Sequence, residues 1–164
     1  MGVLTDYFRA ADAASVVRAV EQADGGSPLT ARPPAFDGVE TKRLDPAVIL
    51  AQLVAAIREV PWQVDLVQET YVWPTSPPPG PEGGEDEDDP WMTGPWVSQL
   101  PPQVRDTLAG AHDSRLPAIA ARWVQAEELH GALADHMEPV ARDLVLLARR
   151  ARDAGEQLYC WTCL

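Results

Sequence analysis

The stretch from Pro74 to Pro102 constrains the fold of this chain more than any other part of its 164 residues. It holds nine of the 16 prolines, and its centre reads PEGGEDEDDP. Proline lacks a backbone N–H, and a run of acids without bases cannot bury enough apolar surface to fold by itself. Neither flank looks self-sufficient as a domain. We therefore predict a single domain over residues 1–164, in which 74–102 is a long Pro-rich acidic surface loop.

The chain before this loop carries both strand and helix signals. Two segments have helical periodicity and begin at a capping aspartate, Asp12 and Asp45, the second followed by Pro46 at the first helical position. They end near residues 23 and 59. Strand-like alternation or a β-branched and aromatic composition marks three segments: GVLTDYFR (2–9), VETKRL (39–44) and VDLVQETYVW (64–73).

The chain after the loop is helical until its last eight residues. Apolar periodicity predicts helices within 101–111, from Asp113 or Ser114 to just before Gly131, and over 136–153, and QLYCWTCL (157–164) follows as a strand. No internal repeat is visible. The pattern as a whole predicts an α+β fold, with four to five helices packed on a small mixed sheet that includes both chain termini.

The only two cysteines, Cys160 and Cys163, lie in the last of these strands. A redox C-x-x-C motif needs a helix that begins at the motif, and none can follow here. Strand alternation would point the two sulfurs to opposite faces, so we interpret both as structural residues, with redox or metal use as the alternative.

The sequence contains no complete set of metal ligands. Glu127 and His130 have the E-x-x-H spacing of half a di-iron site, but a second pair is missing. The other histidines, His112 and His136, do not have zinc-finger spacing. No G-x-S-x-G, P-loop or G-x-G-x-x-G motif occurs. We therefore expect no cofactor and no metal, and the absence of catalytic motifs weighs against an enzyme.

The formal net charge of −12 narrows the classes of partner. It opposes binding to nucleic acid and to anionic lipid, both of which require Lys and Arg to neutralise phosphate, and it favours basic partners. No apolar run approaches the length of a membrane span, and the first residues lack the pattern of a signal peptide. These features predict a cytoplasmic protein that binds neither membrane nor nucleic acid.

The segment between Arg58 and Arg105 contains no Lys or Arg but nine acids and four tryptophans. Acids can steer a basic partner toward a surface, and indole rings supply contact area. The predicted partner-binding residues are Glu82, Glu85, Asp86, Glu87, Asp88, Asp89, Trp91 and Trp96. The alternative is a solubilising loop held in place by core tryptophans.

Several stretches resemble known proteins. FDGVETKRLDPAVILAQLVAAI, GPW and RLPAIAARWVQAEELHG through LARRARDAGEQLYCWTCL look like a group of small uncharacterised actinobacterial proteins. MGVLTDYF at the start and RRARDAGEQL before the last strand are more distantly similar to YfbM-like proteins. The second resemblance implies an α+β fold, and neither implies catalytic residues or a function.

Two functional hypotheses follow. The first is a non-enzymatic acidic interaction protein, of the immunity or regulatory type, that binds a basic protein such as a toxin or nuclease. The alternative is a small enzyme or ligand-binding protein with a cleft between sheet and helices, lined by histidines and acidic residues. A pocket with convergent groups of shifted pKa would favour the alternative, and a shallow acidic face would favour the first.

Overall fold

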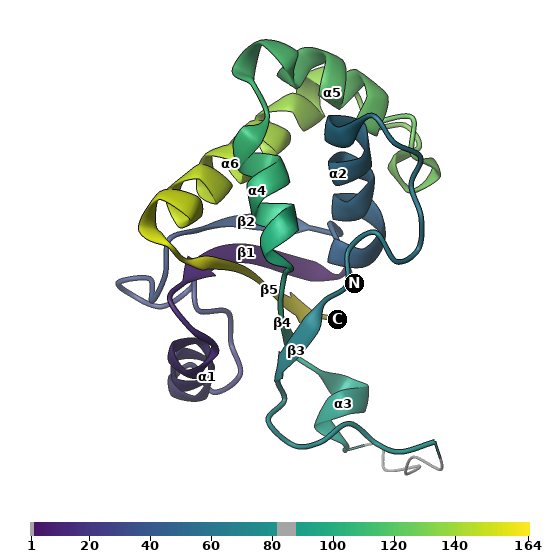
Figure 1. Ribbon diagram of the computed structural model, residues 1–164. Helices are drawn as coiled ribbons and strands as arrows, with labels where there is room; N and C mark the ends of the chain where they lie inside the picture. Colours follow the sequence, from purple (N-terminus) through teal and green to yellow (C-terminus); the bar gives the residue numbers. More distant parts are fainter. Residues whose placement is uncertain (1, 82–87) are drawn as a thin grey trace.

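The computed structural model describes residues 2–81 and 88–164 and has an α+β fold (Figure 1). Its described residues form one five-stranded sheet and six α-helices, of which five have eight residues or more. The strands are β1 (Leu4–Ala10), β2 (Gly38–Lys42), β3 (Thr70–Trp73), β4 (Trp96–Gln99) and β5 (Gln157–Cys163). The helices are α1 (Ala13–Gln22), α2 (Ala51–Arg58), α3 (Pro90–Thr93), α4 (Pro102–Gly110), α5 (Leu116–Trp123) and α6 (Ala134–Ala154). None of these helices is both long enough and apolar enough to cross a membrane.

The sheet has the strand order β2-β1-β5-β4-β3, and every neighbouring pair is antiparallel. The predicted inclusion of both chain ends is confirmed, because Leu4 of β1 lies opposite Cys163 of β5. The prediction of a mixed sheet is wrong. Whether a pair is parallel or antiparallel depends on which strands become neighbours. Here β5, the last strand of the chain, lies between the β1–β2 pair and the β3–β4 pair and is antiparallel to both of its neighbours.

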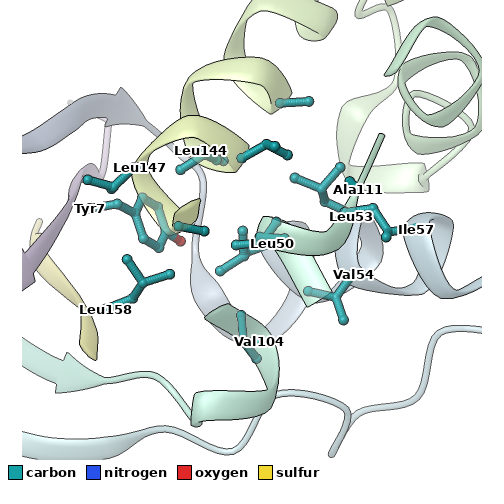
Figure 2. Packing of buried hydrophobic residues seen from close by; sticks show 14 of the residues in the cluster. Tyr7, Leu50, Leu53, Val54, Ile57, Val104, Ala111, Leu144, Leu147 and Leu158 are labelled. Carbon is teal, nitrogen blue, oxygen red and sulfur yellow. The ribbon is translucent and has the colours of Figure 1, made fainter. Parts of the chain in front are cut away.

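Helices cover the two faces of the sheet unequally. Figure 1 shows α2, α4 and α6 over one face, with α5 against α2 and α6, while α1 lies alone on the other. The main core fills the space below α2, α4 and α6, and Figure 2 shows Tyr7 and Leu158 of the sheet facing Leu50, Leu53 and Leu144 there. A smaller core under α1 contains Phe8, Val16, Val20, Val97, Tyr159 and Trp161.

Both predicted aspartate caps are present. Asp12 accepts a hydrogen bond of 2.7 Å from the backbone N–H of Ser15, and Asp45 accepts one of 2.8 Å from that of Val48. The helix after Asp45 starts as a π-helical turn, η1 (Pro46–Leu50), which continues directly into α2. This turn matters for the site, because it places Pro46 and Ala47 over the edge of the sheet.

Three predicted boundaries differ from the structure. The segment 64–73, predicted as a strand, is a strand only over Thr70–Trp73. The predicted loop 74–102 contains the short helix α3 and the interior strand β4, which is possible because prolines flank residues 96–99 and none lies within them. The predicted helix from 113 to 130 begins as a 3₁₀ turn, η2 (Asp113–Arg115), and its α-helical part ends at Trp123. Glu127 and His130 thus lie around a separate 3₁₀ turn, η3 (Glu127–Leu129), and not on an α-helix.

Candidate functional site

Four strands each contribute one side chain to a row on the face of the sheet that α2, α4 and α6 cover. Tyr7 on β1 lies opposite Cys160 on β5, Cys160 lies opposite Ser98 on β4, and Ser98 lies opposite Tyr71 on β3. Residues directly opposite one another on antiparallel strands share a face. The row runs from the core, where Tyr7 is 1% exposed, to the sheet edge, where Tyr71 is 53% exposed.

A pocket of about 210 Å³ lies over the outer part of this row. One wall is the beginning of η1, and the rest comes from β3, β4, β5 and the residue before β3. The lining residues are Asp45, Pro46, Ala47, Glu69, Tyr71, Trp96, Ser98, Cys160 and Thr162. It therefore lies between the sheet and a helix start, but none of the three histidines lines it.

Glu69 is an acid of this pocket whose pKa is shifted by its surroundings. Its Oε1 accepts a hydrogen bond from the hydroxyl of Ser98. Burial raises the pKa of the Glu69 carboxyl, the Ser98 hydrogen bond offsets part of this rise, and the negative charge of Asp45 adds to it. Glu69 therefore carries its charge at a cost that a positive charge in the pocket would relieve.

Cys160 forms part of the pocket floor as a thiol. It is 1% exposed, and its Sγ lies 3.6 Å from the Thr162 hydroxyl. Burial raises the pKa of Cys160 to about 12, so the reactive thiolate is scarce at neutral pH. Cys160 belongs to the main core and Cys163 packs against the smaller one, which confirms that they lie on opposite faces of β5. Both are free thiols.

The charges around the pocket have one sign. Asp45 and Glu69 are its ionisable acids, and no Lys, Arg or His lines it. Among the residues that the structure describes, no ion pair includes either acid. The described ranges also contain no group of three or more potential metal ligands. An anionic ligand would be repelled, whereas a cation would find two carboxylates and two aromatic side chains, Tyr71 and Trp96.

An aromatic cluster adjoins the pocket. The rings of Tyr71 and Trp91 meet edge to face, with centroids 5.6 Å apart and an angle of 80° between the planes. The Trp96 indole donates a hydrogen bond of 3.1 Å to the carbonyl of Trp91, and the Trp91 indole donates one of 3.0 Å to that of Ser76. The predicted anchors Trp91 and Trp96 are thus brought together, and Trp96 belongs to the pocket as well.

The predicted acidic residues are distributed differently. Glu82, Glu85, Asp86 and Glu87 lie outside the described residues. Asp88 is exposed, and Asp89 is half-buried, where its side chain caps α3 by accepting a hydrogen bond of 2.9 Å from the N–H of Trp91. Asp89 therefore has a structural role beside the aromatic cluster.

Of the residues that line the pocket, the sequence predicted only Trp96 as a binding residue. Glu69 was one of nine acids in a segment without bases, and Ser98 lay within a predicted loop. The only available signal was strand alternation in β5, which correctly placed Cys160 and Thr162 on one face. The pairing of β4 with β5, which brings Ser98 to Cys160, connects residues about sixty positions apart and leaves no local signal.

Comparisons with known proteins do not identify a family. The chain matches no protein-family model, no curated protein and no solved structure among those with which it was compared. The resemblance to small actinobacterial proteins and to YfbM-like proteins therefore stays a prediction.

Proposed function

We propose that this protein is a non-enzymatic binding protein that holds a positively charged group, an ammonium or guanidinium, in the pocket at Glu69. The observation that carries the proposal is the half-buried Glu69 carboxylate beside Asp45 in a pocket that no basic residue lines. Partial burial removes water from the carboxylate, and a ligand that supplies a cation offsets part of that cost. The volume of about 210 Å³ suits one such group and is small for a nucleotide.

Binding is favoured over catalysis by the chemistry of the lining. The buried Cys160 thiol, with its pKa raised to about 12, is a poor nucleophile. The Ser98 hydroxyl donates a hydrogen bond to Glu69, and no histidine lines the pocket to act as a general base that would activate Ser98. A small enzyme that uses Glu69 as a general acid is the alternative, since a raised carboxyl pKa suits that role.

The cation can come from two sources, a free small molecule or a side chain of a basic protein. The Tyr71–Trp91–Trp96 cluster favours the second source, because it offers aromatic contact area next to the pocket and Trp91 follows the acidic segment closely in the sequence. In this version the acids of residues 82–89 steer the partner, Glu69 receives one Lys or Arg, and the protein acts as an immunity-type or regulatory factor.

The first test uses arginine amide and, as a negative control, acetate, with binding measured by calorimetry or NMR titration. Arginine amide should bind and acetate should not. Glu69→Gln should weaken the binding by roughly ten- to hundredfold, the usual effect of losing a hydrogen bond to a charged group. Glu127→Gln removes the same charge from an exposed turn and is the matched control. Equal loss in both variants, or no binding by the wild type, would refute a cation site at Glu69.

The second test separates the two sources. A short peptide of alternating Arg and Gly should bind more tightly than arginine amide if the surface around the pocket receives a protein. Replacing residues 85–89 by Ser should then slow association at low salt and leave a Ser at the α3 cap, where it can replace Asp89. If the peptide gains nothing over arginine amide, the ligand is a small molecule and the basic protein partner should be abandoned.

A further inference from the structure

Strand β2 has backbone N–H and C=O groups along its outer side that no other described residue uses. Arg43 donates its N–H to the carbonyl of Val3, and Arg9 donates its N–H to the carbonyl of Asp37, at 2.9 and 3.1 Å. Together with the register of β1 and β2, these bonds show that the backbone N–H and C=O groups of odd-numbered residues of β2 point toward β1. The N–H and C=O groups of the even-numbered residues, Glu40 and Lys42, therefore point away from the sheet.

The two edges of the sheet are not equally available. β3 is four residues long and its pairing with β4 is irregular between Tyr71 and Trp73, and such bulges protect an edge from further pairing. β2 pairs with β1 over Gly38–Lys42 without a shift in register. A lysine on an edge strand usually discourages pairing with another strand. In β2, however, Glu40 lies two residues from Lys42, so a partner strand with the opposite order of charges could pair with this edge.

The sequence of β2 complements itself in one antiparallel register. If a second copy of β2 lies beside the first with a two-fold axis at Thr41, Glu40 of each copy lies opposite Lys42 of the other. These positions carry the outward N–H and C=O groups, so each Glu40–Lys42 pair exchanges two backbone hydrogen bonds and opposes two opposite charges. Both side chains are exposed in the single chain. A slip of one residue would place Glu40 opposite Thr41 or Arg43, and a slip of two in one direction would place it opposite the other Glu40, so this match would be lost.

An apolar groove adjoins this edge on the side of α6. It has a volume of about 390 Å³ and is lined by Val39, Glu40, Thr41, Lys42, Leu44, Met137, Val140 and Asp143. A strand added to β2 would cover its open side and remove water from Val39, Met137 and Val140, which are half-buried in the single chain.

We propose that the protein forms a two-fold symmetric dimer in which the β2 strands of two copies pair antiparallel through Glu40, Thr41 and Lys42. The pairing joins the two five-stranded sheets into one. It does not use the pocket at Glu69, which lies toward the opposite edge. The net charge of −12 on each copy opposes association, so the dimer should be tested near 0.15 M salt, where charges are screened beyond about 8 Å.

The experiment is sedimentation velocity or light scattering at about 1 to 100 µM chain, a range that detects micromolar dissociation constants. The wild type should dimerise. Lys42→Glu places like charges opposite each other in both pairs, as does Glu40→Lys, and each should raise the dissociation constant at least about tenfold. The double variant Glu40→Lys with Lys42→Glu restores opposite charges and should restore the dimer. Circular dichroism checks that every variant is folded.

A second variant tests the backbone bonds. Glu40→Pro removes an N–H that β1 does not use, so it should abolish the dimer in a folded chain, because proline is tolerated on an edge strand. Three outcomes would overturn the proposal: a monomeric wild type at the highest concentration, single variants that dimerise as well as the wild type, or a double variant that stays monomeric.

Discussion

The indole N–H of Trp123 donates a hydrogen bond of 2.9 Å to the backbone carbonyl of Ile49. This bond connects the end of α5 to the π-helical turn η1, across 74 residues of sequence. Trp123 is 1% exposed and Ile49 is 8% exposed, so both partners are removed from water. The same turn forms a wall of the pocket at Pro46 and Ala47. Trp123 therefore helps to hold the pocket wall without touching the pocket.

Trp123→Phe should lower the free energy of unfolding by about 1 to 3 kcal/mol, because it leaves the Ile49 carbonyl buried without this donor and removes part of a ring from the core. Urea denaturation measures the change. Trp62→Phe is the control, since Trp62 is 40% exposed, and it should shift the free energy by less than about 0.5 kcal/mol. Equal effects of the two substitutions would contradict the role given to Trp123.

The two cysteines should differ in reactivity. Burial raises the pKa of Cys160 to about 12, so the thiolate is scarce at pH 8, and the side chain is also shielded from reagents. Cys163 is half-buried, next to the last residue of the chain. Iodoacetamide at pH 8 should therefore modify one cysteine in the folded chain and two in urea, as mass spectrometry can count. Rapid labelling of folded Cys163→Ser would show that Cys160 is more accessible than the structure indicates.

Glu69 should make stability depend on pH. Its pKa is raised in the folded state, so the folded chain binds this proton more tightly than the unfolded chain does. The wild type should lose stability as the pH rises from the usual carboxyl value of 4.5 through the raised value, and the loss should stay constant above it. Glu69→Gln does not titrate, so it should match the wild type below pH 4.5 and exceed it at pH 8.

Thermal unfolding from pH 4 to pH 8 gives this difference directly. Glu127→Gln reports the effect of removing one surface charge. If Glu69→Gln is less stable than the wild type at pH 8, burial does not destabilise the charged Glu69 carboxylate, and the physical reason for a cation to bind there is lost.

Asp37 should affect stability in the opposite way, because its contribution to the free energy of unfolding is lost as the pH falls. It accepts hydrogen bonds from Arg150, at 2.7 and 3.1 Å, and from Arg9, at 2.8 Å, and these arginines hold its pKa below the usual value. Asp37→Asn should cost about 1 kcal/mol at pH 7, because both pairs are partly exposed. This difference should disappear as the pH falls below 3.8 through the lowered pKa, and it should shrink in 1 M salt.

Asp153→Asn is the matched control for Asp37. Its pair with Arg152 is longer, at 3.6 Å, and Asp153 is more exposed. The control should change the free energy of unfolding little. A similar loss for both substitutions would show that the network joining β1, Asp37 and α6 contributes no more than a single surface pair.

Local interactions made much of this protein predictable from its sequence. The caps at Asp12 and Asp45 follow from contacts within a few residues, and the opposite faces of Cys160 and Cys163 follow from the two-residue period of a strand. These features locate α1, the helix that begins at Asp45 and the strands at the two chain ends, and they predict an α+β fold.

The tertiary structure alone decided which strands become neighbours. β5 comes last in the chain but occupies the middle of the sheet, and β4 lies in a segment whose prolines hide a strand of four residues. Ser98, Cys160 and Glu69 meet only because β4 pairs with β5 and β3 with β4. The raised pKa values of Cys160 and Glu69, and the sign of charge that the pocket accepts, depend on burial and on neighbours distant in sequence. These properties arise only in the folded protein, where distant segments surround Glu69 and Cys160.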